Sequence, residues 1–135
     1  RNNLITFPAF INALAPNFPE AGMTANFFGN DFTAYVYKDE NGVWPGYVAK
    51  INAAANESDL ATWLSNLEKA DLSEFFVTSP GTFEAFKDGS LNSIPDRYAV
   101  GTNKGASFGY GTANGQLIIA TSYNGMKEAF RLLGL

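Results

Sequence analysis

The apolar positions begin with an uncharged segment, residues 2–19, that predicts a short helix. Four large residues recur at i, i+3, i+4 and i+7, the spacing of one helix face: Phe7, Phe10, Ile11 and Leu14. Thr6 can cap such a helix and Pro8 suits its first turn. We therefore expect a helix from about Pro8 to Leu14. It either docks on the rest of this chain, which we favour, or packs on a neighbouring subunit.

The next pattern changes period from helical to alternating and predicts a β-hairpin. Over residues 32–38, Tyr35 and Tyr37 fall on one face of a strand, and the apolar residues that alternate with them fall on the other face. The dipeptide Asn41-Gly42 can form the tight turn, because both residues tolerate a positive φ. A second strand follows over 43–52, with a bulge or a late start at Pro45-Gly46.

Helical spacing returns after residue 56, where Asn56 or Ser58 can cap a second helix, and again after 121, where Thr121 or Ser122 can cap a third that ends at Gly134. Between them we expect a short strand over 82–86, a turn over 87–90, and a meander of strands over 97–101, 106–112 and 116–121. The apolar run 117–120 predicts a central strand buried on both faces. We expect one core cluster that contains Leu60, Trp63, Leu64, Leu67, Ile118, Met126 and Phe130.

This order of elements predicts an α+β fold. Strands joined by tight turns are antiparallel, and each helix has one apolar face to cover. We expect a two-layer sandwich, with an antiparallel sheet of about five or six strands and three helices mainly on one face. The chain of 135 residues has the length of a single domain, 1–135, with an N-terminal helix segment (1–30) and a core of hairpin, helix and meander (31–135).

Composition excludes several kinds of chemistry. The chain has no histidine and no cysteine, which removes imidazole bases, thiolate nucleophiles and disulfides. Its net charge is −4 and its nine basic residues are scattered, so we expect no nucleic-acid partner. No apolar run is long enough to cross a membrane as a helix, so we expect no membrane insertion.

The remaining motifs favour structural roles over catalysis. A pair of carboxylates could hydrolyse glycosides, but each acidic cluster has a local role in a turn, a helix start or a helix face: Asp39-Glu40, Glu57 with Asp59, and Glu68 with Asp71 and Glu74. The glycine-rich stretches 101–105 and 109–111 match no phosphate-binding motif, and we interpret them as turn and strand glycines. We therefore expect no enzyme activity, no cofactor and no metal.

The aromatic residues of the hairpin provide the one candidate binding face. Tyr35 and Tyr37 lie on the first strand, and Trp44 and Tyr47 lie on the second. If these four side chains are exposed together, they form a flat platform suited to sugar rings or to a protein partner. The alternative is that helices cover them.

Several segments resemble a family of uncharacterised domains from envelope-associated proteins of ultra-small candidate-phyla bacteria. The segments that carry the resemblance are 46–51 (GYVAKI), Trp63 with 71–76 (DLSEFF), 97–100 (RYAV), and 116–122 (QLIIATS) leading into Met126. The resemblance covers roughly residues 4–134. The family has no assigned activity, so it implies an extracytoplasmic setting and no functional residue.

These observations favour a non-catalytic extracytoplasmic module that mediates protein–protein contact or self-assembly. Only 16 % of the residues are charged, against roughly 25 % in typical domains, which is more often seen outside the cell. Partners would be another protein or further copies of the chain. The alternative is a carbohydrate-binding module that uses the aromatic hairpin face. The chain begins with Arg1 and not with Met, which we interpret as a mature or excised fragment.

Overall fold

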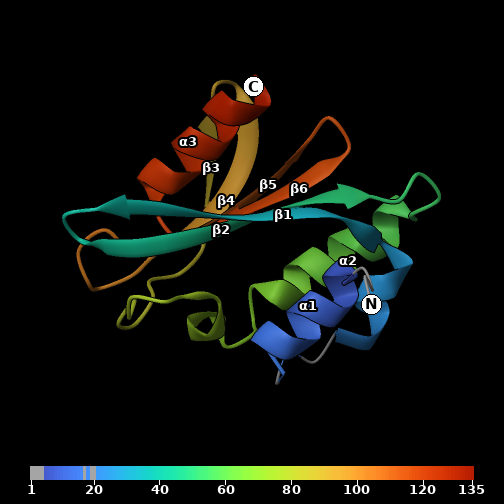
Figure 1. The fold of residues 1–135 in the computed structure, drawn as a ribbon, viewed down its shortest axis with the longest axis horizontal. Helices are drawn as coiled ribbons and strands as arrows, with labels where there is room; N and C mark the ends of the chain where they lie inside the picture. The colour runs from blue at the N-terminus through green and yellow to red at the C-terminus, as the bar shows by residue number, and fades with distance from the viewer. Residues whose placement is uncertain (1–4, 17, 19–20) are drawn as a thin grey trace.

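A six-stranded antiparallel sheet forms the centre of the molecule in the computed structural model, which describes residues 5–16, 18 and 21–135 (Figure 1). Its strand order is β1-β2-β6-β5-β4-β3. The strands are β1 (Phe28–Asp39), β2 (Gly42–Ile51), β3 (Lys87–Leu91), β4 (Ile94–Val100), β5 (Ser107–Ala113) and β6 (Gln116–Ala120). The helices are α1 (Phe7–Leu14), α2 (Glu57–Leu67) and α3 (Tyr123–Leu133), with 3₁₀ turns η1 (Ala21–Asn26) and η2 (Leu72–Phe75).

The predicted α+β sandwich is confirmed. Two of the helices, α1 and α2, lie on one side of the sheet, and α3 lies on the other side (Figure 1). The predicted single core cluster is wrong, because the sheet divides the core in two. Trp63 and Leu67 belong to the cluster on the α1/α2 side, whereas Ile118, Met126 and Phe130 belong to the cluster beneath α3. Leu60 and Leu64 are only partly buried against the first cluster.

Strand β6 shows why the core divides. It lies between β2 and β5, and successive side chains of a strand point to opposite faces. Leu117 and Ile119 therefore join the α1/α2 cluster, and Ile118 and Ala120 join the α3 cluster. The prediction of a central strand buried on both faces is confirmed.

Side-chain caps start the helices where the sequence predicted. Thr6, Asn56 and Ser122 each accept a hydrogen bond from the backbone N–H three residues later, at 3.2, 3.0 and 2.9 Å. Helix α3 ends at Gly134, whose φ of 74° is the left-handed conformation that favours glycine. Thr121, the alternative cap, instead donates its hydroxyl to the carbonyl of Pro45 at 2.6 Å and extends the contact between β6 and β2.

The segment 82–93 differs from the prediction. The expected strand over 82–86 is reduced to an isolated bridge between Phe83 and Gly101, and the expected turn over 87–90 is strand β3. The turn lies at Asn92-Ser93, where both residues have a positive φ (52° and 67°). Such a turn matches the twist of a hairpin, but it normally contains glycine. Because the glycine of this segment, Gly89, lies inside the strand, the sequence pointed to the wrong turn.

The described part of the N-terminal segment docks on its own chain. Phe7 and Ile11 are buried in the α1/α2 cluster, and the Phe7 ring packs edge-on against Phe28 with 5.0 Å between centroids. The preferred prediction of docking is therefore confirmed for α1, while residues 2–4, 17 and 19 lie outside the described residues. Among the helices of the described part, none is long and apolar enough to cross a membrane.

Candidate functional site

The four aromatic residues predicted as a binding face do not form an exposed surface. Trp44 and Tyr47 have exposed fractions of 1 % and 4 %. The Trp44 indole N–H donates to Oδ1 of Asp39 at 3.0 Å, and the Tyr47 hydroxyl donates to the carbonyl of Phe75 at 3.0 Å. Burial raises the pKa of Tyr47 to about 12. Both polar tips are thus bonded within the protein.

The two tyrosines of β1 lie beneath α3. The Tyr35 hydroxyl donates to the carbonyl of Gly125 at 3.0 Å, and its ring lies across Gly46, where a Cβ atom would be only 2.1 Å from the ring. Burial is the main reason why the pKa of Tyr35 is raised. Tyr37 is half-buried next to Gly125.

Strand geometry explains this correction. Trp44 and Tyr47 are three positions apart, and residues at an odd separation on a strand point to opposite faces. Tyr47 joins the α1/α2 cluster, while Tyr35 packs against the α3 cluster. The four side chains therefore form no exposed platform. Helices lie over Tyr35, Tyr37 and Tyr47, whereas Trp44 is buried against Phe76 outside the helices. The carbohydrate-binding hypothesis loses the surface on which it depended.

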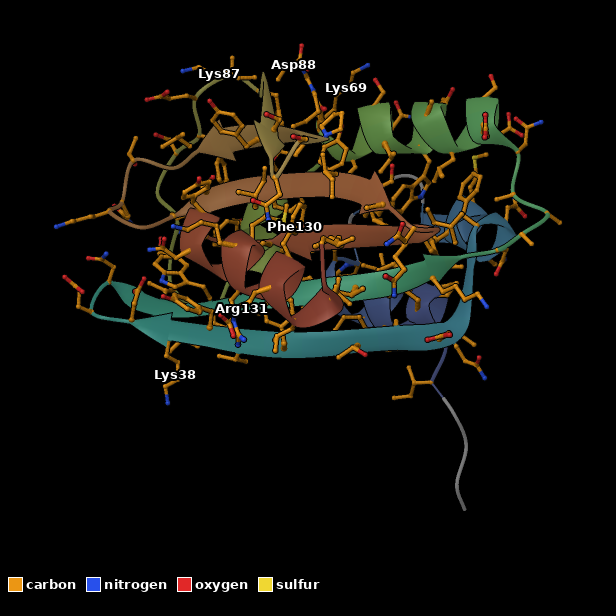
Figure 2. The ribbon with its side chains drawn as sticks, turned by 90° about the horizontal axis from the view of Figure 1, so that it is seen from above. Lys38, Lys69, Lys87, Asp88, Phe130 and Arg131 are labelled. Carbon is orange, nitrogen blue, oxygen red and sulfur yellow. The ribbon has the colours of Figure 1, made fainter. Side chains whose placement is uncertain are left out.

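The structure instead shows a groove on the α3 side of the sheet. Helix α3 packs on β1, β2, β5 and β6. In Figure 2 it lies over the middle of the sheet, and β3, marked by Lys87 and Asp88, lies outside the area that the helix covers. A helix is about 10–12 Å across, whereas six strands about 4.8 Å apart spread over roughly 24 Å. One helix cannot cover this face, and part of β3, β4 and β5 stays open.

Small residues deepen this open part into a hollow of about 460 Å³, which we call the β5 groove. Gly89 and Gly109 lie in its floor, and Met126 and Tyr123 of α3 form one wall. Met126 is buried, whereas Tyr123 is 57 % exposed at the rim. Binding pockets for small ligands commonly have volumes of about 300–1,000 Å³, so the β5 groove is large enough for a side chain or a small molecule.

Asp96 is the only charged residue among the described residues that line the β5 groove. Its Oδ1 atom is buried and has no hydrogen-bond partner within the described part of the chain. Burial raises the pKa of this carboxyl group above its ordinary value. The carboxylate lies directly over Gly89, where an added Cβ would be 2.6 Å from Oδ1 and 2.9 Å from the Tyr98 ring. Glycine at 89 is thus required by the close approach of these two side chains.

Arg97, on the opposite face of the sheet, is paired with two carboxylates. Arg97 donates from Nε and Nη2 to the two carboxylate oxygens of Glu68, at 2.8 and 2.7 Å, and from Nη1 to Asp88 at 3.0 Å. The Tyr110 hydroxyl also donates to Glu68. The hydrogen bonds from Arg97 are the main reason why the pKa of Glu68 is lowered. A hollow of about 620 Å³ adjoins this cluster, but its Glu68–Arg97 pair is already satisfied.

The β5 groove can bind a group but holds few means of catalysis. It offers one carboxylate, hydroxyl groups from residues such as Ser90 and Ser107, and apolar walls. Within the described residues, no group of three or more acidic side chains is arranged to hold a metal ion. A second carboxylate next to Asp96, which most glycoside hydrolases require, is not among the described lining residues.

Sequence reasoning did not identify Asp96, Tyr98 or Met126 as site residues. The main obstacle was the incorrect prediction of a turn at 87–90. With a turn there, the predicted sheet had no strand β3 and therefore no floor for the groove. A usable signal was nevertheless present in Gly109-Tyr110-Gly111, correctly interpreted as strand glycines. Two glycines separated by one residue leave the same face of a strand bare, and such a face permits a close approach by a ligand.

The chain was also compared with known proteins. A scan of protein-family models, a search of curated proteins and a search of solved structures each find no match.

Proposed function

We propose that this protein is a non-catalytic binding module that holds a segment of a partner protein in the β5 groove. The observation that carries this proposal is the uncovered hollow of about 460 Å³ around Asp96, a buried carboxylate oxygen without a partner in the described chain. Buried polar atoms nearly always have a hydrogen-bond partner, so an unpaired one on a residue that lines a groove favours a role in binding.

The residues around Asp96 favour a protein as the partner. Tyr98, Tyr123 and Met126 line the groove, and tyrosine and methionine are enriched where proteins meet. Val100, which is partly exposed, adds apolar surface next to them. The module would act outside the cytoplasm, a setting that the small charged fraction and the resemblance to envelope-associated domains support.

Selection from a library of random 12-residue peptides displayed on phage tests this function. Ser107→Trp places a large ring inside the β5 groove, whereas Ser58→Trp places the same ring on the exposed start of α2. Peptides selected on the unaltered protein should bind Ser107→Trp at least tenfold more weakly and Ser58→Trp equally well. Urea unfolding would verify that both variants are folded.

Two results would contradict the proposal. Either no peptide is enriched, or the enriched peptides bind Ser107→Trp as well as they bind the unaltered protein. In both cases the β5 groove is not a site for a protein segment.

A further inference from the structure

The negative charge in the β5 groove has no compensating charge from the described part of its own chain. Arg97 follows Asp96 directly, but neighbouring residues of a strand point to opposite faces, and the Arg97 guanidinium is bonded to Glu68 and Asp88. The Lys127 ammonium lies 4.9 Å from the centre of the Tyr123 ring, and Lys127 is not among the residues that line the groove. Asp96 therefore lines the groove without an ion-pair partner among the residues that the structure describes.

The surroundings of Asp96 select among the groups that could supply that counter-charge. The side chains of Tyr98 and Met126 line the groove together with Asp96, so an occupant that meets the carboxylate also contacts apolar surface. Lysine and arginine combine these properties, since each has an apolar stem and a cationic head. The aromatic rings add to the attraction, because tyrosine faces bind cations, as Tyr123 already does with Lys127.

We propose that the β5 groove recognises a lysine or arginine side chain of its partner, with the cationic head against the Asp96 carboxylate and the stem between Tyr98 and Met126. This inference rests on the proposed function and specifies the chemistry of the partner. The head supplies a hydrogen-bond donor to the Asp96 carboxylate, one oxygen of which has no partner within the described residues. The net charge of −4 on the chain further favours a cationic partner.

The test compares two display libraries of 12-residue peptides, one unrestricted and one without lysine and arginine. We expect groove-dependent peptides, meaning those that Ser107→Trp weakens, only from the unrestricted library, with a basic residue in common. For one such peptide, replacing that basic residue by norleucine should weaken binding about tenfold or more. Asp96→Asn should weaken the original peptide by a similar factor and leave the norleucine peptide unaffected, the pattern of a direct pair in a double-mutant cycle.

A matched variant separates local pairing from overall charge. Glu40→Gln removes one negative charge at the exposed β1–β2 turn, from a residue that does not line the groove, and should change binding less than twofold. If Glu40→Gln weakens binding as much as Asp96→Asn does, the attraction is general and the inference is wrong. Groove-dependent peptides from the library without lysine and arginine would also overturn it, while the proposed function would stand. Failure of both libraries to give groove-dependent peptides would overturn both.

Discussion

One face of strand β5 carries large aromatic side chains, and the other face carries small residues. Phe108 and Tyr110 point to the α1/α2 side, where both are buried in the larger cluster. Gly109 and Gly111 point to the α3 side, where Gly109 lies in the floor of the β5 groove. The α1/α2 side is filled by aromatic rings with two helices over them, whereas the α3 side has one helix and small residues beside it.

This difference indicates a division of roles between the two sides of the sheet. Trp63 on the α1/α2 side contacts the rings of Phe18, Phe27 and Phe28, and its indole N–H donates to Thr24 at 3.1 Å. On the α3 side, Asp96 has a buried oxygen that has no such partner within the described residues. We infer that the first side contributes most of the stability and that the second keeps surface available for a partner.

The largest effect should come from removing the centre of the α1/α2 cluster. Trp63 is 1 % exposed, so Trp63→Ala should lower the free energy of unfolding by about 3–5 kcal/mol. Urea denaturation followed by circular dichroism measures this loss. Leu132→Ala, at a 64 % exposed position of α3, is the control and should change the free energy of unfolding by less than about 0.5 kcal/mol. Equal midpoints for the two variants would show that α2 does not hold the fold as described.

A smaller loss in the free energy of unfolding is expected for Met126, which lies between the α3 cluster and the β5 groove. Met126 is buried, but it also lines the β5 groove, so the space left by Met126→Ala is continuous with an existing hollow. We therefore expect a loss of about 2 kcal/mol, the lower end of the range for such truncations. The same urea titration measures it. A loss as large as that of Trp63→Ala would mean that the two sides are equally tightly packed, and the proposed division of roles would fail.

Much of the fold could be predicted because its signals are local. Caps at Thr6, Asn56 and Ser122 need only a few neighbouring residues, and the structure has all of them. The site could not be predicted in this way, because the β5 groove combines residues from β3, β4, β5 and α3. Which face of the sheet α3 covers is decided by packing between distant segments, and that choice buried Tyr35 and left Asp96 open to the groove.

The two sides also hold carboxyl groups whose pKa values shift in opposite directions. Hydrogen bonds from Arg97 lower the pKa of Glu68, so its ionised form stabilises the fold above its ordinary pKa of 4.5, and this contribution is lost as the pH falls through the lowered value. Burial raises the pKa of Asp96, so its contribution is most favourable below the ordinary value of 3.8 and is lost as the pH rises through the raised value. Acidification should therefore remove the stabilising contribution of Glu68 on the first side and the destabilising charge of Asp96 on the second.

Replacing these two carboxyl groups should therefore give the smallest changes in the free energy of unfolding, and at pH 7 the two changes should have opposite signs. Glu68→Gln should lower the free energy of unfolding by about 1 kcal/mol, because its ion pair with Arg97 is partly solvated. Asp96→Asn should raise it by less than about 1 kcal/mol, because an uncompensated charge leaves a partly buried site. At pH 3 both carboxyl groups lose charge in the unfolded chain, and Asp96 also loses it in the native state. Urea titrations at pH 3 should therefore bring the free energy of unfolding of each variant closer to that of the unaltered protein. If Asp96→Asn instead destabilises the protein at pH 7, the carboxylate has a structural partner, and the β5 groove is not kept open for a cation.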